Sequence, residues 1–286
     1  MASGVLMLIF SFLAFYKVEE SDFFDGQTWS AWSNALNLFP LATVIVLIGV
    51  ALAAAVAAAR FGGVSLPAGL FGFSWSDLRL LAGILGTLTL LAYLLRSTQG
   101  VDKGIGLIIT TLASVGLLVG AVMERQASSP AAAPAETGGG AGQPTPAVLV
   151  ILGSGLVLLI GSFLSVVEDT SAWGEAAFPL FTLPAILGVI VAGQVAAGEF
   201  AGIQLPGILG LTWSKIRLSF SAWAAFIMVA LLIGRVSVEG SEISKGAGFW
   251  IMLVASIALV VGAVMKEGEG ARPAPAAAPP PPPPPA

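Results

Sequence analysis

Few side chains of this sequence could carry out chemistry, and two types are missing. The 286 residues include no Cys and no His. This excludes disulfides, thiolate chemistry, Cys/His zinc sites, catalytic histidines and haem held by either residue. No charged residue lies near the middle of any predicted helix; Gln194 is the most polar side chain at depth, and Glu199 lies at a helix end. Proton relays and acid/base pairs need such buried groups, so we expect no enzymatic activity and no cofactor.

Two acidic stretches are the remaining candidates for a cation site. Carboxylate oxygens suit calcium or magnesium, but the spacing here matches no EF-hand loop. We favour the interpretation that both stretches are solvated loops. The first contains Glu19, Glu20, Asp22 and Asp25, and the second contains Glu168, Asp169 and Glu175.

The composition is that of a membrane protein. Hydrophobic residues make up 57% of the chain and charged residues only 10%, against about 25% charged residues in soluble domains. The net charge of −4 argues against a nucleic-acid partner. A membrane span takes about 20 residues, within a range of roughly 17 to 25. Eight apolar blocks approach this length: 2–16, 35–59, 80–95, 105–123, 147–167, 180–197, 218–234 and 247–265.

The first block is short, with Lys17 directly after it, whereas block 147–167 is of spanning length. Neither a basic n-region nor an A-x-A cleavage site supports a signal peptide. We therefore hypothesise that the sequence begins inside the first helix. Block 80–95 reaches spanning length only if residues such as Ser76 and Asp77 begin the helix.

Two segments are predicted to be disordered. Residues 126–146 are rich in Ala, Pro, Gly and Ser, a composition with too little apolar surface to fold. The tail 268–286 ends in the proline run 279–285, which favours an extended polyproline II rod. The predicted domains are thus a four-helix unit 1–125, the linker 126–146, a second four-helix unit 147–267 and the tail 268–286.

An internal repeat relates the two units. The segment 66–80 matches 205–218 with one residue deleted, and four shorter matches keep the same order along the chain. Similarity between apolar helices is common, but five ordered matches, several of them in polar loops, indicate a duplication. The shorter matches are Ser11-Phe12-Leu13 with Ser162-Phe163-Leu164, Ser30-Ala31-Trp32 with Ser171-Ala172-Trp173, Phe39-Pro40-Leu41 with Phe178-Pro179-Leu180, and Val119-Gly120-Ala121-Val122-Met123 with Val261-Gly262-Ala263-Val264-Met265.

An even number of helices in each unit predicts two parallel units, unlike the inverted repeats of many transporters. The predicted face that bears the linker, the tail and both Leu-Pro loops carries more basic residues than the other face. The positive-inside rule therefore places linker and tail in the cytoplasm of a plasma-membrane protein. The basic residues of this face are Arg60, Arg79, Arg125, Lys215, Arg217, Lys266 and Arg272.

Small residues recur at four-residue spacing in equivalent helices of both units. Close backbone approach at such residues allows helices to pack in lipid, so we favour packing within the chain; a dimer face is the alternative. In the second helices the residues are Gly49, Ala53 and Ala57, matched by Gly188, Ala192 and Ala196. In the fourth helices Gly116 and Gly120 match Ala258 and Gly262.

The two Leu-Pro loops are predicted to be interfacial elbows. Proline cannot continue a helix, and Trp75 and Trp213 favour the headgroup region. Arg79 and Arg217 would extend towards lipid phosphates. An anchoring turn is the interpretation we favour, with a specific lipid site as the alternative.

The repeated S-F-L, F-P-L, L-P…W-S and V-G-A-V-M motifs resemble those of uncharacterised four-helix integral membrane proteins of actinobacteria. The resemblance covers nearly the whole chain, twice over, and implies a plasma-membrane location without any assigned activity.

We therefore expect a non-enzymatic membrane scaffold or assembly partner. The alternative is a passive channel or facilitator for a small solute between the units. Besides the lipid bilayer, the sequence leaves room for a membrane or cytoplasmic protein partner, which the proline run could recruit, and for a homo-oligomer.

Overall fold

The structure is a computed structural model that describes most of the chain. The described residues are 1–18, 26–70, 72–97, 101–127, 143–167, 169–175, 177–203, 205–234, 237–238, 241–242 and 244–270. Glu19, Glu20, Asp22, Asp25 and Glu168 of the acidic stretches lie outside these residues, as do most of the predicted linker and nearly all of the tail.

Apolar helices dominate the described residues. They are α1 Ala2–Ser11, α2 Leu41–Phe61, α3 Trp75–Leu95, α4 Ile105–Ala127, α5 Pro146–Phe163, α6 Leu183–Phe200, α7 Trp213–Ile233 and α8 Ala247–Gly270. Seven of them, α2 to α8, are long and apolar enough to cross a membrane. The expected mostly helical fold with several helices of membrane length is therefore confirmed.

The first predicted span is shorter than expected. Helix α1 has only 10 residues, which at 1.5 Å per residue gives about half the thickness of a bilayer core. The rest of block 2–16 leaves the helix, and Tyr16 lies in a short strand, β1 Tyr16–Lys17.

Capping residues set where α3 and α7 begin. The Ser74 hydroxyl accepts a hydrogen bond from the Asp77 amide, and the Asp77 carboxylate accepts one from the Ser74 amide, which together form a capping box. The Thr212 hydroxyl caps α7 in the same way, accepting from the Lys215 amide. Both helices thus begin several residues before the apolar blocks 80–95 and 218–234.

Short antiparallel strand pairs lie in the connections between helices. Strand β1 lies between β2 Thr28–Trp29 and β5 Asp102–Lys103, while β6 Ser165–Val167 pairs with β7 Thr170–Ser171. The remaining pairs are β3 Gly69–Leu70 with β4 Phe73–Ser74, and β8 Ser237–Val238 with β9 Ser241–Glu242.

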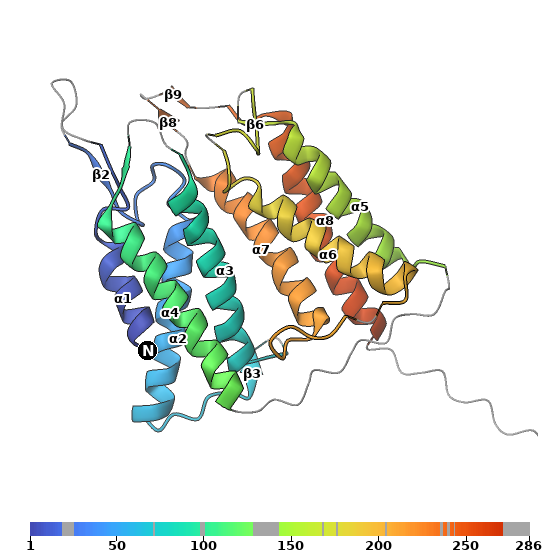
Figure 1. Cartoon of the computed structure of the whole chain (residues 1–286), viewed down its shortest axis with the longest axis horizontal. Helices are drawn as coiled ribbons and strands as arrows, with labels where there is room; N and C mark the ends of the chain where they lie inside the picture. The colour runs from blue at the N-terminus through green and yellow to red at the C-terminus, as the bar shows by residue number, and fades with distance from the viewer. Residues whose placement is uncertain are drawn as a thin grey trace, which may run out of the picture.

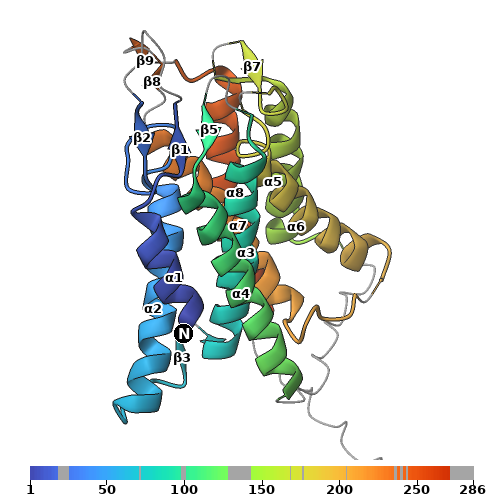
Figure 2. The same ribbon diagram turned by 60° about the vertical axis from the view of Figure 1, so that its left-hand side comes forward.

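The helices form two groups that stand side by side (Figure 1). In the first half of the chain, residues 1–127, α1 contacts α2 and α4, and α3 packs on α4. In the second half, residues 143–270, α5 contacts α6 and α8, and α7 packs on α8. The β3–β4 elbow and the starts of α3 and α7 lie at one end of the molecule, called here the elbow end; β1, β2, β5 and β6 to β9 lie at the opposite end, the far end (Figures 1 and 2).

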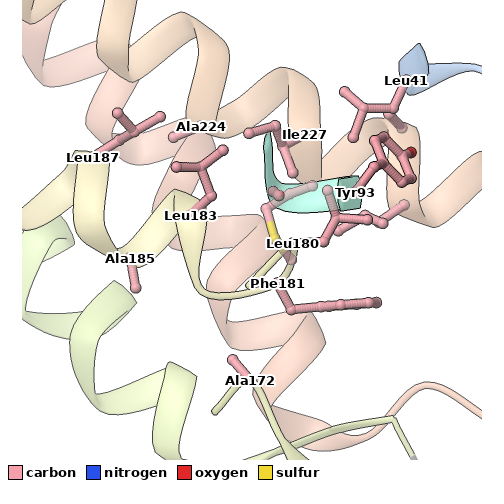
Figure 3. Packing of buried hydrophobic residues seen from close by; sticks show 14 of the residues in the cluster. Leu41, Tyr93, Ala172, Leu180, Phe181, Leu183, Ala185, Leu187, Ala224 and Ile227 are labelled. Carbon is pink, nitrogen blue, oxygen red and sulfur yellow. The ribbon is translucent and has the colours of Figure 1, made fainter. Parts of the chain in front are cut away.

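One hydrophobic core joins the two halves. Leu41 and Tyr93 of the first half belong to the same buried cluster as Leu180 and Ile227 of the second half, and none of the four is exposed (Figure 3). The Trp223 indole of α7 donates a hydrogen bond to the Thr89 hydroxyl of α3, at 3.0 Å. The contact between the halves is therefore packed with side chains at these positions.

The outer surfaces of the helices are apolar. Leu112 on α4, Leu156 on α5 and Val254 on α8 expose between 57% and 66% of their surface. Exposed side chains of this kind on helices of spanning length are those that face lipid tails.

Matching contacts recur at the far end. The Trp32 indole donates to the Ser11 hydroxyl at 3.0 Å, and Trp173 donates to Ser162 at the same distance. The hydroxyls of Thr43 and Thr182 donate to the carbonyls of Ala31 and Ala172, each at 2.6 Å. Phe12 stacks on Trp32 and Phe163 on Trp173.

Candidate functional site

The elbows place tryptophan at the end of the helix bundle. The Trp75 indole donates a hydrogen bond to the Pro67 carbonyl at 2.8 Å, and the Trp213 indole donates to the Pro206 carbonyl at 3.0 Å. Each hydrogen bond closes the loop between the Leu-Pro pair and the helix that follows. Both indoles thereby sit at the first residue of a helix, beside the charged residues of that first turn.

A buried ion cluster lies at the elbow end between the halves. The Asp77 carboxylate accepts hydrogen bonds from the Arg125 guanidinium and from Lys215 Nζ, the latter at 2.6 Å. The Asp77 and Arg125 side chains are 5% and 9% exposed. Arg125 also donates to the Leu209 carbonyl in the second elbow. One carboxylate thus connects α3 and α4 of the first half to α7 of the second.

The two halves carry opposite charges at the equivalent positions of this cluster. When the matching sequence segments are aligned, Asp77 corresponds to Lys215, and Arg125 corresponds to Glu267. Asp77 and Lys215 touch one another, so two identical halves packed in this way would bring two like charges together. Like charges in such a poorly solvated place repel strongly, and the inversion replaces that repulsion with attraction.

The two elbow arginines lie in different environments. The Arg79 guanidinium forms a 2.8 Å ion pair with Glu124, and both side chains are partly exposed. The Arg217 side chain is only 4% exposed; it pairs with Glu267 at 3.0 Å and donates to the Gln194 side chain at 3.4 Å. The Ser214 hydroxyl donates to the same Glu267 carboxylate. Arg217 is thus held inside the bundle, and Arg79 keeps access to the surface.

A cavity of about 260 Å³ opens beside Arg79 in the first half. The end of α2, the first elbow, the beginning of α3 and the end of α4 line it. Its lining residues are Leu52, Ala55, Val56, Ala59, Arg60, Leu66, Trp75, Arg79 and Glu124.

The predicted small-residue stripe of α2 and α6 faces the first helix of its own half. A Cβ added to Gly4 would lie 2.4 Å from the Gly49 carbonyl oxygen and 2.6 Å from the Ala53 Cβ. In the second half, a Cβ added to Gly155 would lie 2.5 Å from the Ala192 Cβ and 3.0 Å from the Gly188 carbonyl oxygen. These positions therefore bring helix backbones together within each half; Ala57 and Ala196, one turn further on, are half-buried.

The predicted stripe of α4 and α8 is less uniform. A Cβ on Gly116 would meet the Ser3 hydroxyl of α1 at 3.2 Å, and one on Gly262 would meet Ile151 of α5 at 2.8 Å. Gly120 has nothing within 4 Å of such an added atom, and Ala258 is half-buried.

The sequence pattern points to Trp75, Arg79, Trp213 and Arg217 but not to the ion cluster beside them. A signal was present, because the matched elbows align Asp77 with Lys215. The change of charge sign at these matched positions coincides with the contact between Asp77 and Lys215. Among the described residues, no group of three or more Asp or Glu side chains could hold a metal ion.

Seven helices of this length and apolarity, with ionic contacts at their ends, are the features of a multi-pass membrane protein. Comparisons of the chain with protein-family models, with curated proteins and with solved structures found no match.

Proposed function

We propose that this chain is a non-enzymatic, multi-pass protein of the plasma membrane that acts as a scaffold or assembly partner. The observation that carries the proposal is the contact between the halves, where a shared hydrophobic core and a buried ion cluster hold the helices in one arrangement. A rigid bundle of this kind presents fixed helix faces to other membrane proteins.

In this proposal the architecture is a tandem duplication of a parallel four-helix unit, with α1 to α4 as one copy and α5 to α8 as the other. The five ordered sequence matches support it. So do the matched Trp–Ser and Thr–Ala hydrogen bonds at the far end and the matched Trp–Pro hydrogen bonds of the elbows.

The elbow end is proposed to face the cytoplasm, together with the linker and the tail. The positive-inside rule supports this orientation, because Arg60, Arg79, Arg125, Lys215 and Arg217 all belong to the elbow-end segments.

The packing between the halves favours a scaffold over a solute pathway. A passive channel would need a polar or open route there, but Tyr93, Leu180 and Ile227 fill the contact and are fully buried. In the described helices the charged side chains lie in terminal turns, which leaves no pair of ionisable groups at depth for acid/base chemistry.

The test compares two properties of the full chain purified in mild detergent. The scaffold predicts a stoichiometric membrane or cytoplasmic protein that stays bound through purification, and liposomes that remain tight to small solutes after the chain is reconstituted. Purification without any partner, together with liposomes made leaky to a solute, would instead establish the channel. Deleting residues 272–286 then decides whether the proline run takes part in binding.

A second experiment tests the parallel arrangement and its orientation. Reporters inserted within 128–142 and fused after residue 286 should both report the cytoplasm. Reporters on opposite sides of the membrane would contradict two same-facing units.

A further inference from the structure

From the cavity at the first elbow, we infer that the first half holds the phosphate of one anionic phospholipid between Arg60 and Arg79. The inference requires the chain to lie in a membrane, but it is independent of the proposed scaffold role. The equivalent positions of the second half carry different side chains, and these differences support the inference.

The cavity combines cationic and apolar surfaces in the order that a phospholipid requires. Arg60 and Arg79 supply the guanidinium groups, whose planar donors suit phosphate oxygens. Leu52 and Val56 of α2 lie one to two turns deeper into the helix and supply an apolar wall. Trp75, at the mouth of the elbow, is the side chain typical of the headgroup level. The phosphate and the first carbons of the acyl chains therefore meet matching surfaces.

The charge of the cavity is unbalanced. Arg79 is paired with Glu124 at 2.8 Å, whereas Arg60 is exposed and has no ion-pair partner among the described residues. Two guanidinium groups and one carboxylate leave one positive charge in the lining. A phosphodiester carries one negative charge, so a phospholipid phosphate would balance the positive charge of the lining.

In the second half, the side chains at the equivalent positions bind one another. Arg60 corresponds to Glu199, and Glu124 corresponds to Lys266, and these two residues form a 2.6 Å ion pair. Ala55 corresponds to Gln194, whose side chain accepts a hydrogen bond from Arg217 at 3.4 Å. The exposed arginine and the small residue of the first half are therefore replaced, and the elbow arginine is retained as Arg217 but is buried.

The size of the cavity fits a headgroup rather than a whole lipid. Its volume of about 260 Å³ is slightly below the roughly 300–1,000 Å³ of pockets that enclose a complete small ligand. The phosphate and glycerol region would occupy it, while the acyl chains continue along the apolar surface of α2. Basic pockets between spanning helices on the cytoplasmic side are a recurrent form of anionic-lipid site.

The test is native mass spectrometry of the full chain in mild detergent, titrated with phosphatidylglycerol or with phosphatidylcholine. Wild type should bind one phosphatidylglycerol more tightly than phosphatidylcholine. Arg60→Gln should weaken phosphatidylglycerol binding about tenfold, since a charge-assisted hydrogen bond is lost. Ala55→Gln, which introduces the amide found in the second half, should weaken it similarly, and Arg60→Lys should retain most of it.

Lys266→Gln is the matched control, because it removes one positive charge beside Glu199, the residue of the second half that corresponds to Arg60. It should leave phosphatidylglycerol binding unchanged. Glycerol phosphate serves as the probe for a simple phosphate site and should not displace the lipid. The inference is overturned if Arg60→Gln binds like wild type, if Lys266→Gln weakens binding equally, or if glycerol phosphate competes.

Discussion

At the scale of single residues, the contacts of the Asp77 carboxylate are expected to contribute strongly to stability. Its carboxylate caps α3, pairs with Arg125 and reaches Lys215 in the other half. Burying charges costs free energy, and removing one member of a buried pair leaves the other charge buried without a partner. Asp77 is thus expected to matter far more than its exposed acidic neighbours.

We predict that Asp77→Ala lowers the free energy of unfolding by about 3 kcal/mol or more, because Arg125 is left buried without its carboxylate. Glu124→Ala removes the partner of a partly exposed arginine and should cost at most about 1 kcal/mol. Unfolding of both variants by increasing mole fraction of dodecyl sulfate in mixed micelles measures the difference. Equal losses for the two variants would mean that the cluster contributes no more than a surface pair.

Tyr16 gives the stability a dependence on alkaline pH. The side chain is fully buried at the far end and donates to the Tyr93 carbonyl at 2.6 Å. Burial raises the pKa of the Tyr16 phenol from 10.0 to about 12, although nearby Arg96 acts in the opposite direction. Between these values the unfolded chain releases the proton and the folded chain keeps it. The free energy of unfolding should therefore be constant in this respect below pH 10 and fall by roughly 2–3 kcal/mol by pH 12.

Unfolding measurements between pH 9 and 12 on wild type and Tyr16→Phe test this dependence. The variant should be less stable at pH 9, because the Tyr93 carbonyl loses its donor, but should show a flatter decline. A parallel decline in both proteins would assign the pH dependence to other groups.

At the scale of elements, the sequence could define most helices but not all of their ends. Helices α4 and α8 begin where the apolar blocks 105–123 and 247–265 begin. Helix α7 begins at Trp213, well before block 218–234, because Thr212 caps it and Lys215 and Arg217 find partners there. The pattern of apolar residues cannot predict that a helix includes charged residues, because the contacts that neutralise these charges are tertiary.

Close helix contacts within each half provide a sharp test of packing. Gly155→Ala places a methyl group 2.5 Å from the Ala192 Cβ and 3.0 Å from the Gly188 carbonyl oxygen, so α5 and α6 must separate. We predict a loss of about 1–3 kcal/mol in the free energy of unfolding.

Gly153→Ala is the control on the same helix, because an added Cβ there has nothing within 4 Å. It should be neutral or raise stability by up to about 1 kcal/mol, since alanine favours helix over glycine. Equal effects of the two variants in micelle unfolding would contradict the packing assigned to α5 and α6.

At the scale of the whole molecule, the sequence predicts a repeat of two units, but it could not predict the contact between the halves. The contact of Asp77 with Lys215 joins residues 138 positions apart, and no local pattern encodes such a pairing. The cavity at the first elbow could not be predicted from the sequence either. It depends on Arg60 and Arg79 lying near one another in space, although only Arg79 falls within the matched segment 66–80.

The contact between the halves predicts that they remain associated without a covalent link. A protease site placed within 128–142 should yield, after cleavage, two fragments that elute together from size-exclusion chromatography in mild detergent. Lys215→Glu should promote their separation, because it places a second carboxylate beside Asp77. Lys17→Glu makes the same charge change at an exposed far-end position and should not. Fragments that separate in the wild type would refute a stable contact.

The opposite charges of Asp77 and Lys215 also bear on how halves of different chains would meet. Two first halves from different chains that met through this surface would confront carboxylate with carboxylate, and two second halves would confront ammonium with ammonium. Each half is thereby discouraged from pairing with its own kind and selects the complementary copy, which the same polypeptide delivers next to it. In a crowded membrane, where chains are inserted one after another, we expect this preference to disfavour mismatched assembly between molecules.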